Sequence, residues 1–135
     1  MGDWGRLLLL QPTSPLRLAS DIDQSLEIMH SSRAPSVISV GKSKHPANWY
    51  ISLDSNLKIK SRLGKVLEQN NGIQNNHIYY FNGAIKAINV KHYKKERAFF
   101  SDNTVVYVMP QKRSIDIDTD IDFKLAELLI NKSNY

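Results

Sequence analysis

Short apolar runs alternate with amphipathic stretches along this chain, and the alternation predicts strands and helices in turn. Residues 7–10 form a continuous leucine run, which is typical of a strand buried on both faces. A polar loop with two prolines follows, and residues 20–31 then carry apolar side chains at helical spacing, with Ser20 as the expected cap. Residues 36–40 predict a second strand, parallel to the first.

The rest of the chain continues this pattern with one interruption. Residues 58–77 are polar, rich in asparagine and weakly periodic, so we expect an excursion from the main sheet there. The pair Asn82-Gly83 predicts a turn or a bulge. Alternation around such an excursion predicts an α/β fold of three layers. The further elements that the pattern predicts are strands at 49–53, 78–80, 84–85 and 104–108 and helices at 90–97 and 120–131.

Composition places the chain among ordinary globular proteins of one domain. It has 135 residues, of which 41% are hydrophobic and 23% are charged. The absence of cysteine excludes disulfides, thiolate nucleophiles and cysteine-based zinc sites. The leucine run is too short to span a membrane and a proline follows it closely, so we expect a cytoplasmic protein that has no membrane partner.

A net charge of +5 arises largely from one basic stretch. A solvated helix face is the first interpretation, because a single tyrosine and no known nucleic-acid motif accompany these charges. Attraction of an anionic substrate is an alternative, and nucleic-acid binding is a remote one. We therefore expect no nucleic-acid partner. The residues of this basic stretch are Lys86, Lys91, Lys94, Lys95 and Arg97.

The segment 114–119 alternates acidic and apolar residues just before the last helix. If it is a strand, Asp116 and Asp118 lie on one face and can share a hard cation such as Mg²⁺. A magnesium ion with open positions would indicate phosphate chemistry. The alternative is that both are surface acids. Thr119 and Asp122 have the spacing of a capping box, so we assign Asp122 to the start of the helix.

Three strings stand out by their length and order. They are Leu8-Leu9-Leu10-Gln11-Pro12-Thr13-Ser14-Pro15-Leu16-Arg17, Asn82-Gly83-Ala84-Ile85 and Ser114-Ile115-Asp116-Ile117-Asp118-Thr119. In order and approximate spacing they resemble the acylneuraminate cytidylyltransferases, also called CMP-sialic acid synthetases, and the resemblance covers nearly all of this chain. It implies a three-layer αβα, Rossmann-like fold of the nucleotide-diphosphosugar transferase type. The family's glycine- and arginine-rich nucleotide loop does not occur in this sequence, so we expect residues 1–135 to be a partial domain, truncated at the N-terminus.

The resemblance also implies an activity and a cofactor. The family transfers CMP from CTP to a nine-carbon α-keto acid sugar, a nonulosonic acid such as N-acetylneuraminate, and releases pyrophosphate. By resemblance, Asp116 and Asp118 are the catalytic aspartates and the Mg²⁺ ligands. Residues 44–78 correspond to the family's dimerisation extension, which implies a homodimer. The alternative function is a non-catalytic remnant, or a dimerising half that needs a separate N-terminal segment.

The resemblance places further residues at the substrates, and each has a second interpretation. Gln11 follows a predicted strand, where open α/β sheets bind ligands. Thr13 and Arg17 either contact substrate or stiffen the loop. The two adjacent phenylalanines either line the pocket for the sugar's acyl group or pack in the core. The substrate-binding residues that the resemblance implies are Gln11, Thr13, Arg17, Asn82, Phe99 and Phe100.

Overall fold

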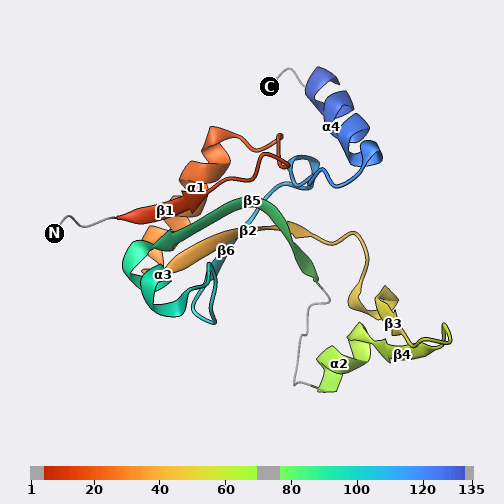
Figure 1. The fold of residues 1–135 in the computed structure, drawn as a ribbon. Coiled ribbons are helices and arrows are strands. Elements are labelled where there is room, and N and C mark those ends of the chain that lie inside the picture. Colours follow the sequence, from red (N-terminus) through yellow and green to blue (C-terminus); the bar gives the residue numbers. More distant parts are fainter. Residues whose placement is uncertain (1–4, 70–76, 133–135) are drawn as a thin grey trace. The chain divides into compact units, whose positions relative to one another are not determined.

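The computed structural model describes residues 5–69 and 77–132. The chain divides into two compact units, one formed by the residues up to Gly41 together with those from Phe81 onward, the other by Lys42–Tyr80. Two short 3-10 turns, Ala47–Trp49 and Gln111–Arg113, accompany the main elements. Those elements, shown in Figure 1, are β1 (Arg6–Leu9), α1 (Ala19–Ser31), β2 (Ser36–Lys42), β3 (Ile51–Leu53), β4 (Ile59–Arg62), α2 (Leu63–Gln69), β5 (Tyr79–Asn89), α3 (Val90–Glu96), β6 (Val105–Val108) and α4 (Asp120–Lys132).

A four-stranded sheet in the order β1-β5-β2-β6 forms the centre of the first unit (Figure 1). β1 runs antiparallel to β5, with Arg6 opposite Asn89, and β2 runs parallel to β6. Backbone N–H groups of Asn89 and Ser43 donate to the carbonyls of Pro35 and Ile78, which makes β5 antiparallel to β2 as well. β1 and β2 are therefore parallel, as predicted, but β5 lies between them.

The main core lies between α1 and one face of this sheet. Met29 of α1 packs with buried residues of three strands, and β6 alternates as a half-covered strand should. Tyr107 of β6 is 6% exposed, whereas Val106 and Val108 on the opposite face are each 47% exposed. The mixed sheet and its helices confirm the predicted α/β class. The buried residues that share the core with Met29 are Val37, Ala84, Ile85, Ala87, Tyr107 and Met109.

β1 is an edge strand, and this corrects one prediction. The leucines at 7–10 are 37–39% exposed, whereas the continuous apolar run predicted burial on both faces. In the described part of the chain, β5 is the one strand hydrogen-bonded to β1. An apolar run shows that side chains favour leaving water, but their burial also requires a neighbour on each side of the strand.

The two long helices begin in different ways. The prediction of Ser20 as the cap of α1 is wrong, because Leu18 occupies the cap position and the Asp21 carboxylate accepts its backbone N–H at 2.8 Å. For α4 the predicted capping box is confirmed, since Asp122 Oδ2 accepts the backbone N–H and the hydroxyl of Thr119 at 2.8 and 2.7 Å. These hydrogen bonds lower the pKa of the Asp122 carboxyl below its ordinary value.

β5 runs directly through the Asn82-Gly83 pair, where a turn or a bulge was predicted. Gly83 has a φ of +70°, a left-handed conformation that glycine adopts without steric cost. The strand continues to Asn89, well beyond the predicted residues 84–85. The glycine therefore changes the local backbone direction within a strand and does not end it.

The second unit contains a small antiparallel pair of strands and a helix. Ile51 of β3 lies opposite Arg62 of β4, and α2 follows directly. The predicted excursion from the main sheet at 58–77 is confirmed for its described part, because β4 and α2 lie there and belong to this second unit, while residues 70–76 are outside the described residues. Every residue of β3 and β4 is exposed. Among all the described residues, no helix is long and apolar enough to cross a membrane.

Candidate active site

The loop that follows β1 is fastened to β5 by side chains that bond to the backbone. Arg17 Nη1 donates to the carbonyl oxygens of Gln11 and Ala84 at 3.2 and 2.7 Å. Ser14 Oγ, which is buried, donates to the carbonyl of Asn82 at 3.2 Å. These hydrogen bonds of Arg17 support the interpretation that it stiffens the loop, while its contact with a substrate stays a prediction.

Asn82 is the centre of a buried polar network that joins three segments. Its side-chain oxygen accepts from Ser39 Oγ of β2 at 2.6 Å and from the backbone N–H of Ala84 at 3.2 Å. Its nitrogen donates to Ser114 Oγ at 3.1 Å and lies 3.5 Å from Met109 Sδ. Since Asn82 is completely buried, this network orders the site from within. The predicted contact between Asn82 and a substrate stays a prediction.

The acidic segment 114–119 is not a strand, which corrects the geometry assumed in the sequence prediction. Two anchors hold it instead. Arg113, just before the segment, makes a bidentate ion pair with Asp21 of α1, with N···O distances of 3.0 and 2.6 Å. Within the segment, the backbone N–H of Ile117 donates to the carbonyl of Thr13 at 2.8 Å. The acidic segment is thereby attached to α1 through Arg113, at its start, and to the loop after β1 through Ile117.

The anchoring ion pair is buried and charged. Asp21 is completely buried and also accepts the hydroxyl of Tyr107 at 2.8 Å. Burial raises the pKa of the Asp21 carboxyl, but hydrogen bonds from Arg113, Leu18 and Tyr107 outweigh it and lower the pKa overall. The hydrogen bond to Asp21 raises the pKa of Arg113. Burial is the main cause that raises the pKa of Tyr107, and its hydrogen bond to the Asp21 carboxylate raises this pKa further. The pair is therefore ionised at neutral pH.

Gln11 and Asp116 meet over Gly83. A Cβ atom placed on this glycine would lie 2.0 Å from Gln11 Oε1 and 3.3 Å from Asp116 Oδ2. The missing side chain leaves the space into which both polar groups extend. Residues that are far apart in the sequence, and that were predicted on separate grounds, are therefore brought together at the end of β1 by β5.

One side-chain oxygen of Asp116 has no hydrogen-bond partner among the described residues. Its Oδ1 is buried and, in the described structure, accepts no hydrogen bond. A buried carboxylate oxygen without a donor is unfavourable, and coordination of a cation would satisfy it. Asp118 is exposed two residues further on, and its backbone N–H donates to Asp122 at 3.2 Å.

The carboxylates at this site suit a Mg²⁺ ion that also binds water and phosphate, and not a metal ion coordinated by protein side chains alone. Among the described residues, no group of three or more His, Cys, Asp or Glu side chains could hold a metal ion. Mg²⁺ commonly binds one or two carboxylates and completes its coordination with water and substrate phosphates. Asp116 and Asp118 therefore provide a donor set of the right kind for a magnesium ion shared with a phosphate ligand.

The two adjacent phenylalanines face different partners. Phe99 packs against Tyr93 of α3, with ring centroids 5.2 Å apart, and Phe100 packs against Phe81 at 5.3 Å. Phe100 is 53% exposed, whereas Phe99 is half-buried. Their predicted role in lining one pocket for an acyl group stays a prediction.

The sequence prediction missed the side chains that hold the site together. Ser39 carried a weak signal, because it is a polar residue within an apolar strand. Asp21 and Arg113 carried none, since they are 92 positions apart and each is an ordinary charged residue in its local context.

Comparisons with known proteins give close agreement over most of the chain. No protein-family model matches. The N-acylneuraminate cytidylyltransferase of Escherichia coli O18:K1:H7 is 31% identical over 135 residues, which are 98% of this chain and 31% of that protein. The CMP-N,N'-diacetyllegionaminic acid synthase of Legionella pneumophila is 38% identical over 127 residues, 92% of this chain and 53% of that protein. The chain thus spans about a third to a half of the length of these two curated relatives.

A solved structure supports the fold. The 4-diphosphocytidyl-2C-methyl-D-erythritol synthase of Anaerococcus prevotii superposes with a TM-score of 0.62 at 14% identity, covering 95% of this chain and 59% of that one. Its similarity shows a nucleotidyltransferase-like α/β fold. Over more than nine tenths of its length, the chain is similar to part of an acylneuraminate cytidylyltransferase and part of a CMP-legionaminic acid synthase, at 31% and 38% identity.

Proposed function

We propose that this chain carries the acidic part of a site that transfers CMP from CTP to a nonulosonic acid and releases pyrophosphate. The observation that carries the proposal is the meeting of Gln11 and Asp116 over Gly83, with one oxygen of Asp116 buried and unpaired. This arrangement occurs in a chain that is 31% and 38% identical to a protein named as an N-acylneuraminate cytidylyltransferase and one named as a CMP-N,N'-diacetyllegionaminic acid synthase. N-acetylneuraminate is the substrate to test first.

The proposed reaction assigns a role to each of these side chains. The anomeric hydroxyl of the sugar attacks the α-phosphorus of CTP, a new O–P bond forms, and the bond to pyrophosphate breaks. Asp118 is the candidate base that accepts the hydroxyl proton, because it is exposed beside Asp116. Gln11 orients the sugar by hydrogen bonding. Mg²⁺ held by Asp116 and Asp118 would supply positive charge to the phosphate oxygens.

The same proposal includes a homodimer formed through Lys42–Tyr80. Several large apolar side chains of this unit are exposed, and contiguous exposed apolar surface is typical of an interaction site. The large exposed hydrophobic residues between positions 49 and 59 are Trp49, Tyr50, Ile51, Leu53, Leu57 and Ile59.

A second candidate function is favoured by β1. Its leucines at 7–10 are exposed along a strand that β5 pairs on one side. In this alternative the chain is a dimerising half, and activity requires a separate segment that covers this edge. The two candidates differ in one property, namely whether the 135-residue chain alone binds CTP.

The test combines a thermal melt with an activity assay on the full chain. Under the first candidate, CTP with MgCl₂ raises the melting temperature, because selective binding stabilises the native state. Pyrophosphate release with N-acetylneuraminate then falls roughly 100-fold or more in Asp116→Asn and Asp118→Asn, since a metal ligand is lost. The control Asp23→Asn removes an exposed acid of α1 and leaves turnover unchanged.

Each negative result has a distinct meaning. A melting temperature that ignores CTP would favour the dimerising half over an active chain. Full turnover in Asp116→Asn, with turnover established for the parent chain, would refute the metal assignment while leaving the transfer reaction standing.

A further inference from the structure

A cationic pocket lies at the end of the sheet that is opposite the candidate active site. Arg6 begins β1 and pairs with Asn89 at the end of β5, and Pro35 lies just before β2. Gln11, in contrast, follows the other end of β1. Five residues of extended chain separate Arg6 from Gln11, or about 16 Å at roughly 3.3 Å per residue. The pocket and the candidate active site are therefore separate features of the sheet.

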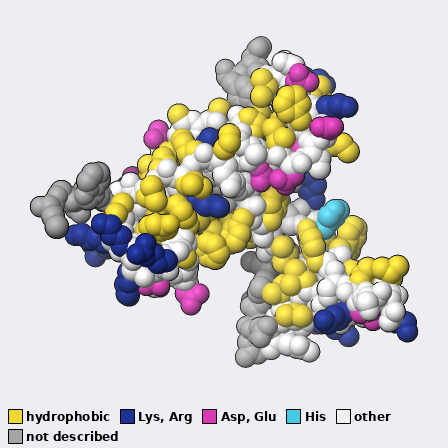
Figure 2. Space-filling view, viewed as in Figure 1, with side chains coloured by type: hydrophobic (Ala, Val, Ile, Leu, Met, Phe, Trp, Pro, Cys, Tyr) yellow, Lys and Arg dark blue, Asp and Glu magenta, His cyan; other side chains and the backbone are white. Residues whose placement is uncertain are grey.

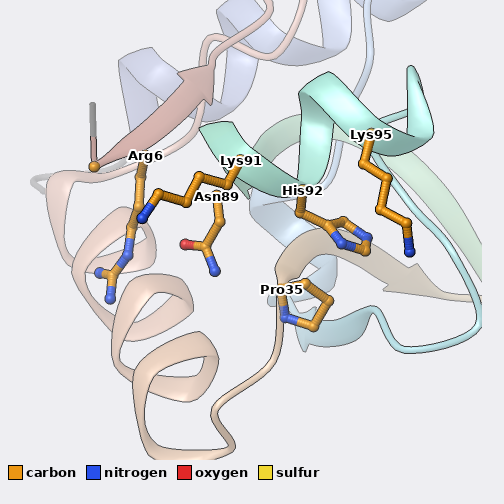
Figure 3. Close-up of a pocket in the computed structure, with 7 residues that line it drawn as sticks. Arg6, Pro35, Asn89, Lys91, His92 and Lys95 are labelled. Atoms are coloured by element: carbon orange, nitrogen blue, oxygen red, sulfur yellow. The ribbon is translucent and has the colours of Figure 1, made fainter. Parts of the chain in front are cut away.

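The lining of this pocket is basic. Its volume is about 650 Å³, within the range of roughly 300–1,000 Å³ that is usual for small-molecule sites. Lys91 and Lys95 are four residues apart on α3, so they lie on one face of that helix. Figure 3 shows Lys91 and Asn89 extending into the same space as Arg6. The described lining, which contains no acidic residue, comprises Gly5, Arg6, Pro35, Asn89, Lys91, His92 and Lys95.

A second pocket extends the first. It has a volume of about 470 Å³, and Arg6 and Asn89 line both pockets. Arg33 and His30, at the end of α1, add further nitrogen donors, and this lining again contains no Asp or Glu among the described residues. Arg6 thus lies between two groups of basic side chains. Figure 2 shows Lys and Arg side chains gathered over α3 and the start of β1.

We propose that these two pockets form one groove that binds a linear anion with two or more phosphate groups. An arginine can hold a phosphate through two parallel N–H···O bonds, and a lysine acts as a compact positive charge. Arg6 in the middle, with Lys91 and Lys95 on one side and Arg33 on the other, suits successive phosphates along a short chain.

The surroundings favour phosphate chains over nucleic-acid bases. Single-stranded nucleic acids are typically held by basic grooves in which aromatic rings stack on the bases. Tyr93, the tyrosine of α3, packs instead against Phe99 with ring centroids 5.2 Å apart. Neither described lining contains Phe, Tyr or Trp. The described lining of the groove thus offers charge without an aromatic side chain for stacking.

An ion pair of Lys95 competes with such a ligand. Lys95 Nζ lies 3.3 Å from Glu96 Oε1, and the two side chains are 80% and 37% exposed. Exposed pairs of this kind are weak, because water and salt screen them. A multivalent phosphate chain that also contacts Arg6 and Lys91 therefore replaces Glu96 as the partner of Lys95.

The test is calorimetric titration of the full chain with inorganic tripolyphosphate, in EDTA and at low salt. Lys91→Gln and Arg33→Gln are each expected to weaken binding about tenfold, because each removes one charge-assisted contact. The matched control Lys94→Gln makes the same charge change on α3 outside both linings and is expected to weaken binding less than about threefold. Equal weakening by Lys94→Gln and Lys91→Gln would show only diffuse attraction and would overturn the proposal.

Two further titrations identify the source of the phosphates. Tripolyphosphate binding more tightly than ATP supports a free oligophosphate, and tighter ATP binding that Lys91→Gln weakens supports a nucleotide. A single-stranded oligonucleotide of equal charge that binds more tightly than either, and equally well in Lys91→Gln, would overturn the proposal. No heat of binding for any of these anions would overturn it too. Thermal melts of all variants verify that they fold like the parent chain.

Discussion

The candidate active site and the small strand pair of Lys42–Tyr80 differ in which of their side chains are buried. At the candidate active site, polar groups are buried and bonded within the chain, as in the network around Asn82 and the pair of Asp21 with Arg113. In Lys42–Tyr80, apolar side chains of both strands are exposed, including Ile51 and Ile59 at 49% and 53%. The candidate site bonds its polar groups within the chain, whereas the exposed strands of Lys42–Tyr80, like the leucines of β1, present apolar surface that a partner would bury.

This contrast predicts which substitutions change the free energy of unfolding and which change the proposed association of two chains. Substitutions at the buried polar groups should lower the free energy of unfolding, because each leaves a charge or a donor without its partner. Substitutions on the exposed strands should change association and leave that free energy nearly unaltered.

The largest expected effect follows from breaking the buried ion pair. Asp21→Ala leaves Arg113 without its bidentate partner and Tyr107 without its acceptor. We expect the free energy of unfolding to fall by about 3–5 kcal/mol in urea denaturation. The control Asp23→Ala, two positions along the same helix and exposed, should change it by less than about 0.5 kcal/mol. Equal effects of the two substitutions would contradict the anchoring role of Asp21.

A smaller effect is expected at the glycine between the two site residues. Gly83→Ala forces a side chain into the left-handed region, at φ +70°, and places a methyl group 2.0 Å from Gln11 Oε1. We expect a loss of about 1–2 kcal/mol in unfolding free energy, together with displacement of the flexible Gln11 carboxamide. Gly5→Ala is the control, because nothing lies within 4 Å of its added carbon. A variant as stable as the parent would show that the backbone adapts.

Acid should remove part of the contribution of Asp21. Burial raises its pKa, but hydrogen bonds from Arg113, Leu18 and Tyr107 outweigh burial and leave the pKa below its ordinary value of 3.8. A carboxyl with a lowered folded-state pKa stabilises the fold above its unfolded-state pKa, and this stabilisation is lost as the pH falls through the folded-state value. The advantage of the parent chain over Asp21→Asn should therefore be full near neutral pH and shrink below about pH 4. Urea denaturation of both proteins across this range measures it, and a difference that does not change with pH would contradict the ionised pair.

The smallest effect on stability is expected on the exposed strands. Ile51→Ser removes an apolar side chain that is 49% exposed and opposite Arg62. At low protein concentration we expect the unfolding free energy to change by less than about 0.5 kcal/mol. In light scattering, the parent chain should have about twice the 15.4 kDa mass of one chain, and the variant should shift toward one. A parent chain that stays at 15.4 kDa would refute the homodimer.

Local patterns predicted those parts of the fold that depend on neighbours in sequence. The periodicity placed α1, α3 and α4 to within a few residues, and Thr119 with Asp122 marked the start of α4. The pattern failed where tertiary context decides. The leucines at 7–10 have the composition of a buried strand but occupy an edge, and the polar residues after Lys58 form β4 and α2 despite weak periodicity.

The candidate site divides in the same way. Asp116 was found from acidic alternation, although its segment is not a strand, and Gln11 from its place after a predicted strand. Ser39 and the pairing of Asp21 with Arg113 were not found, because a contact across 92 positions leaves no trace in a local pattern. The sequence thus indicated two polar residues that the structure brings together, but not the residues that position them.

The bond from Ile117 to Thr13 has a consequence for sequence variation. It joins a backbone amide to a backbone carbonyl, so position 13 can change its side chain freely and still accept the bond. Position 117 has less freedom, because proline has no amide hydrogen and would release the acidic segment. Among natural variants that keep this loop arrangement, we expect an absence of proline at 117, whereas this bond sets no requirement on the side chain at 13.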